Sequence, residues 1–126
     1  LFTRTLVPAM LERGWGRIVN LSSIGVKFGG GSKTFCYSLS KHALEFFPHD
    51  HKTWAARNIL INTLRVGVTD TRIHKVDPEK DMNQRISMIP MARMATPDEI
   101  ANVVCWLGSD QNSYMTGQVI TAAGGE

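Results

Sequence analysis

The sequence is poor in cysteine: its 126 residues include only Cys36 and Cys105, which lie far apart and in no metal-ligand spacing. This scarcity excludes a small disulfide-stabilised scaffold, and we expect no metal site. The sequence also lacks any run approaching the roughly 18 apolar residues of a membrane helix, and its start does not read as a signal peptide. Since two cysteines and no signal fit a reducing compartment, we expect a cytoplasmic protein that binds no membrane.

Charge of one sign is not concentrated anywhere in the chain. The 14 basic residues are scattered, and the formal net charge is only +3. A nucleic-acid-binding surface normally shows a clustered basic face, so we expect no nucleic-acid partner. The composition, 43% hydrophobic and 20% charged, also excludes a disordered chain, and the length allows one domain with a substantial core.

Hydrophobic periodicity predicts helices that alternate with buried strands. The expected helices cover residues 2–13, 37–57 and 97–107. The expected strands cover residues 17–21, 59–64 and 118–122. Pro8 should kink or interrupt the first helix and Pro48 should bend the second, because proline cannot donate the helical hydrogen bond.

This alternation is typical of a parallel sheet with helices on its faces. We therefore predict the α/β class, with a three-layer, doubly wound, Rossmann-like parallel sheet of which this chain is the C-terminal portion only. The chain begins at Leu1 inside a helical pattern, which favours a preceding segment. Residues 65–95 show no sustained period, and we expect them to form a substrate-binding loop. Four methionines there could line an apolar substrate pocket: Met82, Met88, Met91 and Met94.

The clearest chemical pattern is Tyr37-Ser-Leu-Ser-Lys41. Side chains four residues apart on a helix lie on the same face, and an ammonium near a phenol favours the phenolate form. Such a phenol can exchange a proton with an alcohol or carbonyl oxygen near neutral pH. An ordinary surface pair has the same spacing, so the pattern needs context. The adjacent Cys36 is expected to be a small buried residue, because no base stands next to it.

Hydroxyl groups that follow the first predicted strand provide this context. Ser22 and Ser23 come just past residues 17–21, at the edge of the sheet where open α/β folds bind their ligands. A serine there can hold a substrate oxygen by a hydrogen bond. An ordinary serine at the start of a loop explains each residue equally well on its own.

Together these segments resemble the short-chain dehydrogenase/reductase family over essentially all of the sequence. GRIVNLSS resembles the family's strand with the active-site serine, YSLSK its Tyr-x-x-x-Lys motif, and TPDEIANVVCWLGSDQNSYMTGQVITAAGG its C-terminal stretch. The resemblance implies that Tyr37 is the general acid/base and that Lys41 assists it. Both would contact a nicotinamide cofactor, Lys41 through the ribose. Ser23 would orient the substrate oxygen, but its distance of 14 residues from Tyr37 is one longer than usual, so Ser22 stays an alternative.

The resemblance also implies a cofactor-binding segment directly after the second predicted strand. The sequence reads Val66-Gly67 where the family usually has Pro-Gly, and two threonines follow. Cofactor contacts are expected from Val66, Gly67, Thr69 and Thr71, with Thr71 the first choice of the two threonines. A plain turn with two threonines is the alternative reading.

The implied activity is hydride transfer between NAD or NADP and a small alcohol or carbonyl substrate. The family's Gly-rich phosphate loop and the residue that selects NAD or NADP are expected before Leu1. Residues 1–126 would then be the C-terminal part of a single NAD(P)-binding domain and inactive alone. The family also implies a homodimer or homotetramer, for which Phe46, Phe47 and Trp54 could supply a face. A non-catalytic Rossmann-like binding or scaffold protein and an epimerase or dehydratase of the same family stay open.

Overall fold

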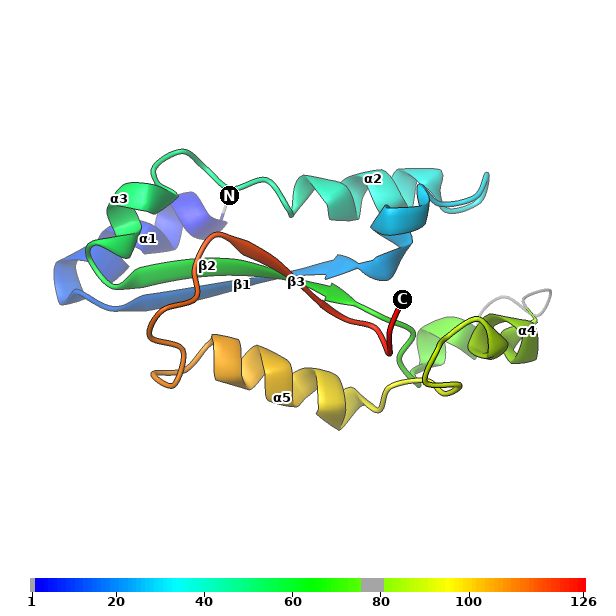
Figure 1. Ribbon diagram of the computed structural model, residues 1–126. Coiled ribbons are helices and arrows are strands. Elements are labelled where there is room, and N and C mark those ends of the chain that lie inside the picture. Colours follow the sequence, from blue (N-terminus) through cyan, green and yellow to red (C-terminus); the bar gives the residue numbers. More distant parts are fainter. Residues whose placement is uncertain (1, 76–80) are drawn as a thin grey trace.

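The computed structural model describes residues 2–75 and 81–126 and contains a parallel three-stranded sheet (Figure 1). The strands, in the order β1-β2-β3, are β1 (Gly16–Ser23), β2 (Ile59–Val66) and β3 (Gln118–Ala122). The α-helices are α1 (Phe2–Arg13), α2 (Phe35–Ala43), α3 (His51–Ala55), α4 (Met82–Ser87) and α5 (Pro97–Leu107). Two short 3₁₀-helices are η1 (Ile24–Phe28) and η2 (Arg72–Lys75).

Helices lie on both faces of the sheet. In Figure 1, α1, α2 and α3 lie above the sheet, α5 lies below it, and α4 lies beyond the ends of the strands. Both strand pairs are parallel, and helices lie in the connections between them. The predicted α/β class and the three-layer, doubly wound arrangement are therefore confirmed. None of the described helices is long and apolar enough to cross a bilayer.

The central strand β2 contributes four of the nine buried apolar residues among those described, more than any other element. Its first six residues are buried, and Ile59, Ile61 and Leu64 are each at most 1% exposed. A strand covered on both faces shows this continuous burial rather than an alternating pattern. Leu107 contributes from the end of α5 and is equally buried.

The helix α5 forms where its local signals predict it. Thr96 Oγ1 accepts a hydrogen bond from Glu99 N at 3.2 Å, and the Glu99 carboxylate accepts one from Thr96 N at 2.8 Å. This reciprocal capping box satisfies backbone donors that the first turn leaves free, and Pro97 stands where no helical donor is needed.

The expectation of one helix over residues 37–57 is wrong, because the helix is broken in two. Within a continuous helix the carbonyl of Leu44 would accept a bond from the backbone nitrogen of residue 48, but Pro48 carries no hydrogen there. Leu44 O instead accepts bonds from Thr63 Oγ1 at 2.8 Å and Asn20 Nδ2 at 3.2 Å. Consequently α2 ends at Ala43, and α3 begins beyond the proline.

Two further boundaries differ from the sequence prediction. Ser22 and Ser23 are the last residues of β1 rather than the start of a loop, because β1 continues in register with the end of β2. The helix α1 also runs through Pro8 without interruption. The carbonyl that Pro8 leaves without a helical donor belongs to Arg4, which lies in the exposed first turn, where water can bind it.

Candidate active site

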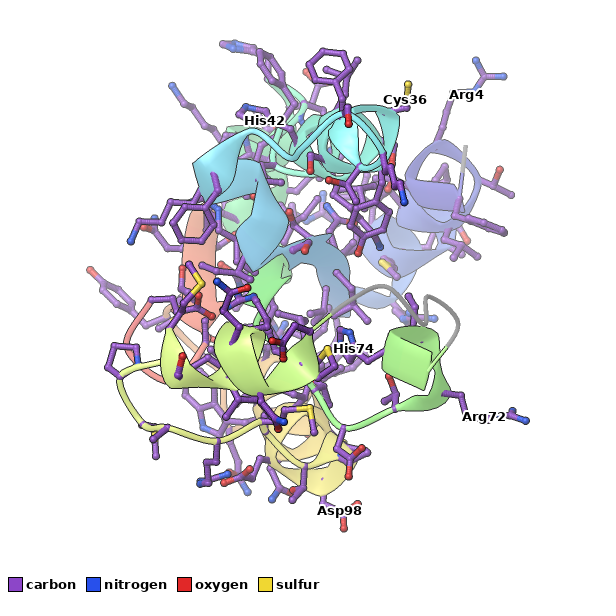
Figure 2. All side chains as sticks on the ribbon, turned by 90° about the vertical axis from the view of Figure 1, so that its right-hand side faces the viewer. Arg4, Cys36, His42, Arg72, His74 and Asp98 are labelled. Carbon is purple, nitrogen blue, oxygen red and sulfur yellow. The ribbon has the colours of Figure 1, made fainter. Side chains whose placement is uncertain are left out.

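The predicted site residues lie on elements that meet at the carboxyl ends of the strands. The register places Ser23 opposite Val66, and Val66 opposite Ala122 of β3. Figure 2 views the molecule from the right-hand side of Figure 1, which is this end of the strands. Here α2 lies above, and η2, marked by Arg72 and His74, lies below.

Tyr37 and Lys41 lie one helical turn apart on α2. Lys41 Nζ donates a hydrogen bond to the carbonyl oxygen of Leu21 on β1, at 3.0 Å. The same nitrogen is 5.8 Å from the centroid of the Tyr37 ring, within range of a cation–π contact. Tyr37 is 45% exposed, so its phenol is accessible to a ligand. The ammonium is thus anchored to the strand and held beside the tyrosine.

The two serines at the end of β1 have different surroundings. Ser22 is 3% exposed, and its hydroxyl donates to Glu45 Oε1 at 2.7 Å, with a longer contact of 3.2 Å to Lys41 O. Ser23 is partly exposed, and its Oγ accepts a bond from Gly25 N at 3.2 Å. This bond uses a lone pair, so the Ser23 hydroxyl keeps its hydrogen for donation.

Residues 24–34, which include η1, join Ser23 to the tyrosine-bearing helix. A Cβ added to Gly25 would lie 3.4 Å from Ser23 Oγ and 3.5 Å from Ser38 Oγ. Gly30 has a φ of 71°, and a Cβ there would lie 2.6 Å from Ser38 Oγ. Since L side chains rarely adopt this φ, the loop between the serine and the tyrosine depends on a glycine at this position.

The predicted cofactor-binding segment continues from β2. Gly67 N donates to Ala122 O at 2.8 Å, which ties the turn to β3. Thr69 is half-buried, and its hydroxyl donates to Gly67 O at 3.1 Å, whereas Thr71 is exposed. Val66 is half-buried as the last residue of β2.

A partly buried ion pair that sequence reasoning missed lies beside these residues. Arg65 Nε and Nη2 donate to the two carboxylate oxygens of Glu45 at 2.7 and 2.6 Å. These bonds hold the pKa of Glu45 below its usual 4.5, whereas burial acts in the opposite direction and the bond from Ser22 lowers it further. The sequence offered only two opposite charges, Glu45 inside the predicted helix 37–57 and Arg65 just after the predicted strand 59–64, and no local pattern that pairs them.

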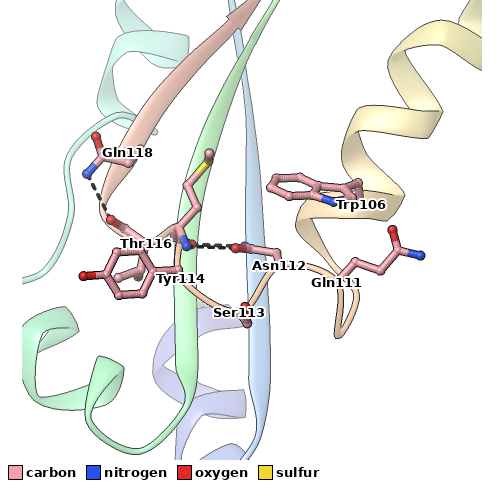
Figure 3. Close-up of a pocket in the computed structure, with 8 residues that line it drawn as sticks. Trp106, Gln111, Asn112, Ser113, Tyr114, Thr116 and Gln118 are labelled. Carbon is pink, nitrogen blue, oxygen red and sulfur yellow. Dashed lines mark hydrogen bonds between the residues drawn. The ribbon is translucent and has the colours of Figure 1, made fainter.

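Two hollows lie among the described residues. One of about 410 Å³ lies where α5 leads into β3, at the amino end of that strand, and Trp106, Asn112 and Tyr114 help to line it (Figure 3). Another, of about 230 Å³, lies between α5, residues 89–95 and the end of β3. Tyr37 lines neither hollow.

The expectation that Cys36 is buried is wrong. Cys36 is exposed, and Figure 2 shows its side chain pointing away from the sheet. It neighbours Tyr37 in the chain, but a helix turns by about 100° per residue, so the two side chains point in different directions.

Comparison with known proteins decides the family. A family model described as "Enoyl-(Acyl carrier protein) reductase" matches residues 1–126, the whole length of the chain. The chain belongs to the short-chain dehydrogenase/reductase family. The resemblance drawn from the residues is thereby confirmed at the level of the family.

Within this family, two relatives illustrate the similarity. The 3-oxoacyl-[acyl-carrier-protein] reductase FabG of Thermotoga maritima is 38% identical over 127 residues, covering 98% of this chain and 50% of the relative. The acetoacetyl-CoA reductase of Allochromatium vinosum is 36% identical over 124 residues, with coverage of 98% and 50%. The chain therefore spans about half the length of the curated relatives it matches.

A solved structure of the family has the same fold. The crystal structure of 3-oxoacyl (acyl-carrier-protein) reductase from Agrobacterium tumefaciens C58 with NADP bound matches with a TM-score of 0.85 and 29% identity. The match covers 98% of this chain and 50% of that chain.

Proposed function

We propose that Ser23, Tyr37 and Lys41 form the catalytic part of an NAD(P)-dependent reductase, which converts a carbonyl group of a 3-oxoacyl thioester to a hydroxyl group. The observation that carries the proposal is the 3.0 Å bond from Lys41 Nζ to Leu21 O. This bond holds the ammonium beside Tyr37, at the end of the strand that also carries Ser23.

In the reductive direction Tyr37 gives its phenolic proton to the substrate oxygen. Ser23 donates its hydroxyl hydrogen to the same oxygen and holds it in place. The Lys41 ammonium, anchored at Leu21 O, stabilises the phenolate that remains, because the opposite charges are close. A reduced nicotinamide cofactor, when bound, supplies a hydride to the carbonyl carbon. Solvent then returns a proton to Tyr37.

The donor groups at this edge fit the nicotinamide and ribose part of such a cofactor. An ammonium carries three hydrogens; one points to Leu21 O, and the other two suit ribose hydroxyls. Thr71 is the first choice of the two threonines, because the Thr69 hydroxyl already donates to a backbone carbonyl. These groups suit NAD and NADP equally. We expect the 126 residues alone to be inactive, since the matched relatives are about twice as long.

The substrate class follows from two considerations. The names of the relatives specify a 3-oxoacyl or acetoacetyl thioester as the substrate of those proteins. In this chain Met88 and Met91 are 66% and 58% exposed, and flexible thioether side chains can pack against an acyl chain. We therefore assign residues 65–95 to the binding of the substrate. Of these, residues 76–80 lie outside the part of the chain that the structure describes.

We also propose a homodimer or homotetramer in the cytoplasm. Phe46 is 84% exposed, whereas Phe47 and Trp54 are half-buried, so Phe46 is the aromatic residue best suited to a subunit contact. Cys36 and Cys105 are both free thiols, which fits a reducing compartment. A monomeric mass by light scattering would contradict the self-association.

The test mixes acetoacetyl-CoA and NADH or NADPH with the protein that contains residues 1–126. The readout is the absorbance of the reduced cofactor. We expect turnover that falls by about 100-fold or more in Lys41→Met, in the range of acid–base contributions. Lys52→Met, on the exposed surface of α3, is the matched control and should keep the wild-type rate.

The rival functions give different results in this assay. A binding or scaffold protein would bind the cofactor without consuming it. An epimerase or dehydratase would convert its own substrate without net change in the cofactor. Cofactor oxidation at equal rates in the wild type and Lys41→Met would overturn the roles assigned here.

A further inference from the structure

The helix that carries Tyr37 and Lys41 is weakly held by apolar packing. Among the nine residues of α2 only Ser38 is buried, and several large apolar side chains of the helix face solvent, including Phe35 and Leu39. Burial of apolar surface is ordinarily the main term that seats a helix on a sheet. The position of α2 therefore depends strongly on its polar contacts.

These polar contacts gather at the C-terminal end of α2. The last carbonyls of a helix have no partner within the helix and need donors from elsewhere. The strands provide them: Thr63 and Asn20 donate to Leu44 O, and Ser22 contacts Lys41 O. Each of these three donors lies on β1 or β2.

Glu45 occupies the centre of this arrangement. Its side chain is only 7% exposed, yet its carboxylate accepts two bonds from Arg65 of β2 and one from Ser22 of β1. A carboxylate just past the end of a helix is unfavourable against the helix dipole, and the planar guanidinium offsets this through two parallel bonds. One side chain thus joins the helix end to two strands.

Ser22, the β1 residue that donates to Glu45, lies between two groups of the proposed site. Ser22 follows Leu21, whose carbonyl anchors Lys41, and precedes Ser23. A shift of the helix end along β1 would therefore change the position of the ammonium relative to its anchor. It would also change the distance from Tyr37 to the Ser23 hydroxyl.

We propose that Glu45 and Arg65 are positioning residues that fix α2 against the end of β1 and thereby hold Lys41 and Tyr37 in register with Ser23. The inference rests on the proposed function for its effect on turnover. Its structural part, the placement of the Lys41 ammonium, can be measured without any turnover.

The experiment compares Glu45→Gln, Arg65→Lys and Glu99→Gln in the protein that carries these residues. Glu45→Gln removes the charge at nearly constant shape, and Arg65→Lys keeps the charge but loses the two-pronged geometry. Glu99→Gln is the matched control, because Glu99 forms the same two-bond pair with Arg93 at the start of α5. The readouts are kcat, the cofactor KM, and the rate at which acetic anhydride labels Lys41, normalised to the exposed Lys52.

We expect Glu45→Gln to lower kcat by about 10- to 100-fold, as a misplacement of the order of 1 Å does, with an unchanged cofactor KM. The kcat of Arg65→Lys should fall between that of this variant and that of the wild type, and Glu99→Gln should match the wild type in the labelling of Lys41. Labelling of Lys41 should be faster in Glu45→Gln, because the loosened helix end releases the ammonium from Leu21 O.

The two proposals fail in different ways. A folded Glu45→Gln with wild-type kcat and wild-type labelling of Lys41 overturns the positioning role. If Glu45→Gln does not fold, Arg65→Lys decides by the same two readouts. A wild type that oxidises no cofactor overturns the proposed function, whereas the labelling rates still test the placement of Lys41.

Discussion

The two serines at the end of β1 should respond to mutation in opposite ways. Ser22→Ala removes a buried hydroxyl that donates to the Glu45 carboxylate, whereas Ser23→Ala removes a partly exposed hydroxyl that accepts from Gly25 N. If Ser23 holds the substrate oxygen, the first change should mainly affect stability and the second mainly turnover.

The structure sets the size of each effect. A hydrogen bond to a charged group contributes about 1.5 to 3 kcal/mol. Glu45 keeps both bonds from Arg65, so we expect Ser22→Ala to cost about 1.5 kcal/mol. Its turnover should fall by less than about tenfold, or 1.4 kcal/mol in activation free energy. Ser23→Ala loses a neutral bond of about 0.5 to 1 kcal/mol. Its turnover should fall by about 100- to 1000-fold, the cost of removing one donor to a reacting oxygen.

Urea unfolding gives the free energies, and steady-state oxidation of NADH or NADPH gives the turnover. The expected result is a crossed order, with Ser22→Ala the less stable variant and Ser23→Ala the less active one. A larger loss of turnover in Ser22→Ala than in Ser23→Ala would refute this assignment and make Ser22 the active-site serine.

Three further predictions concern the fold that supports the site. Arg65 keeps the pKa of Glu45 below its usual 4.5 in the folded protein, so the pair stabilises above that pH and the stabilisation is lost as the pH falls through the lowered pKa. Glu45→Gln should thus be less stable than the wild type at neutral pH and approach it in acid, as measured by urea unfolding across pH. Gly67→Ala should cost about 1 to 3 kcal/mol in the same assay, by overpacking. The new Cβ would lie 2.5 Å from the Cα of Ala123. Thr96→Ala should lower the free energy of unfolding in urea by about 1 kcal/mol, because the helix cap is lost. An unchanged urea midpoint would contradict the capping argument.

Elements with local signals could be predicted from the sequence. The start of α5 follows from Thr96, Pro97 and Glu99, all within four positions, and the structure contains that capping box. The buried strands follow from short β-branched runs, and their parallel pairing follows from the helices between them. The carboxyl edge of the sheet as the place of the candidate site follows from the same topology.

Features that depend on distant contacts could not be predicted in this way. The end of α2 depends on Thr63, which lies 19 residues beyond the carbonyl it binds. The partner of Glu45, Arg65, is 20 residues away on β2. The length of β1 also depends on β2, since Ser22 and Ser23 extend the strand by pairing with its end. The pattern of residues within one short segment does not specify which distant residue it will contact.

The most direct test of the central claim is the turnover of Tyr37→Phe with acetoacetyl-CoA and the preferred reduced cofactor. The account predicts that cofactor binding is retained and that turnover falls by about 100- to 10,000-fold, because the proton donor is lost. Tyr114→Phe is the matched control, since Tyr114 is 97% exposed and lies at the opposite end of the sheet. Turnover of Tyr37→Phe close to that of the wild type would contradict the account.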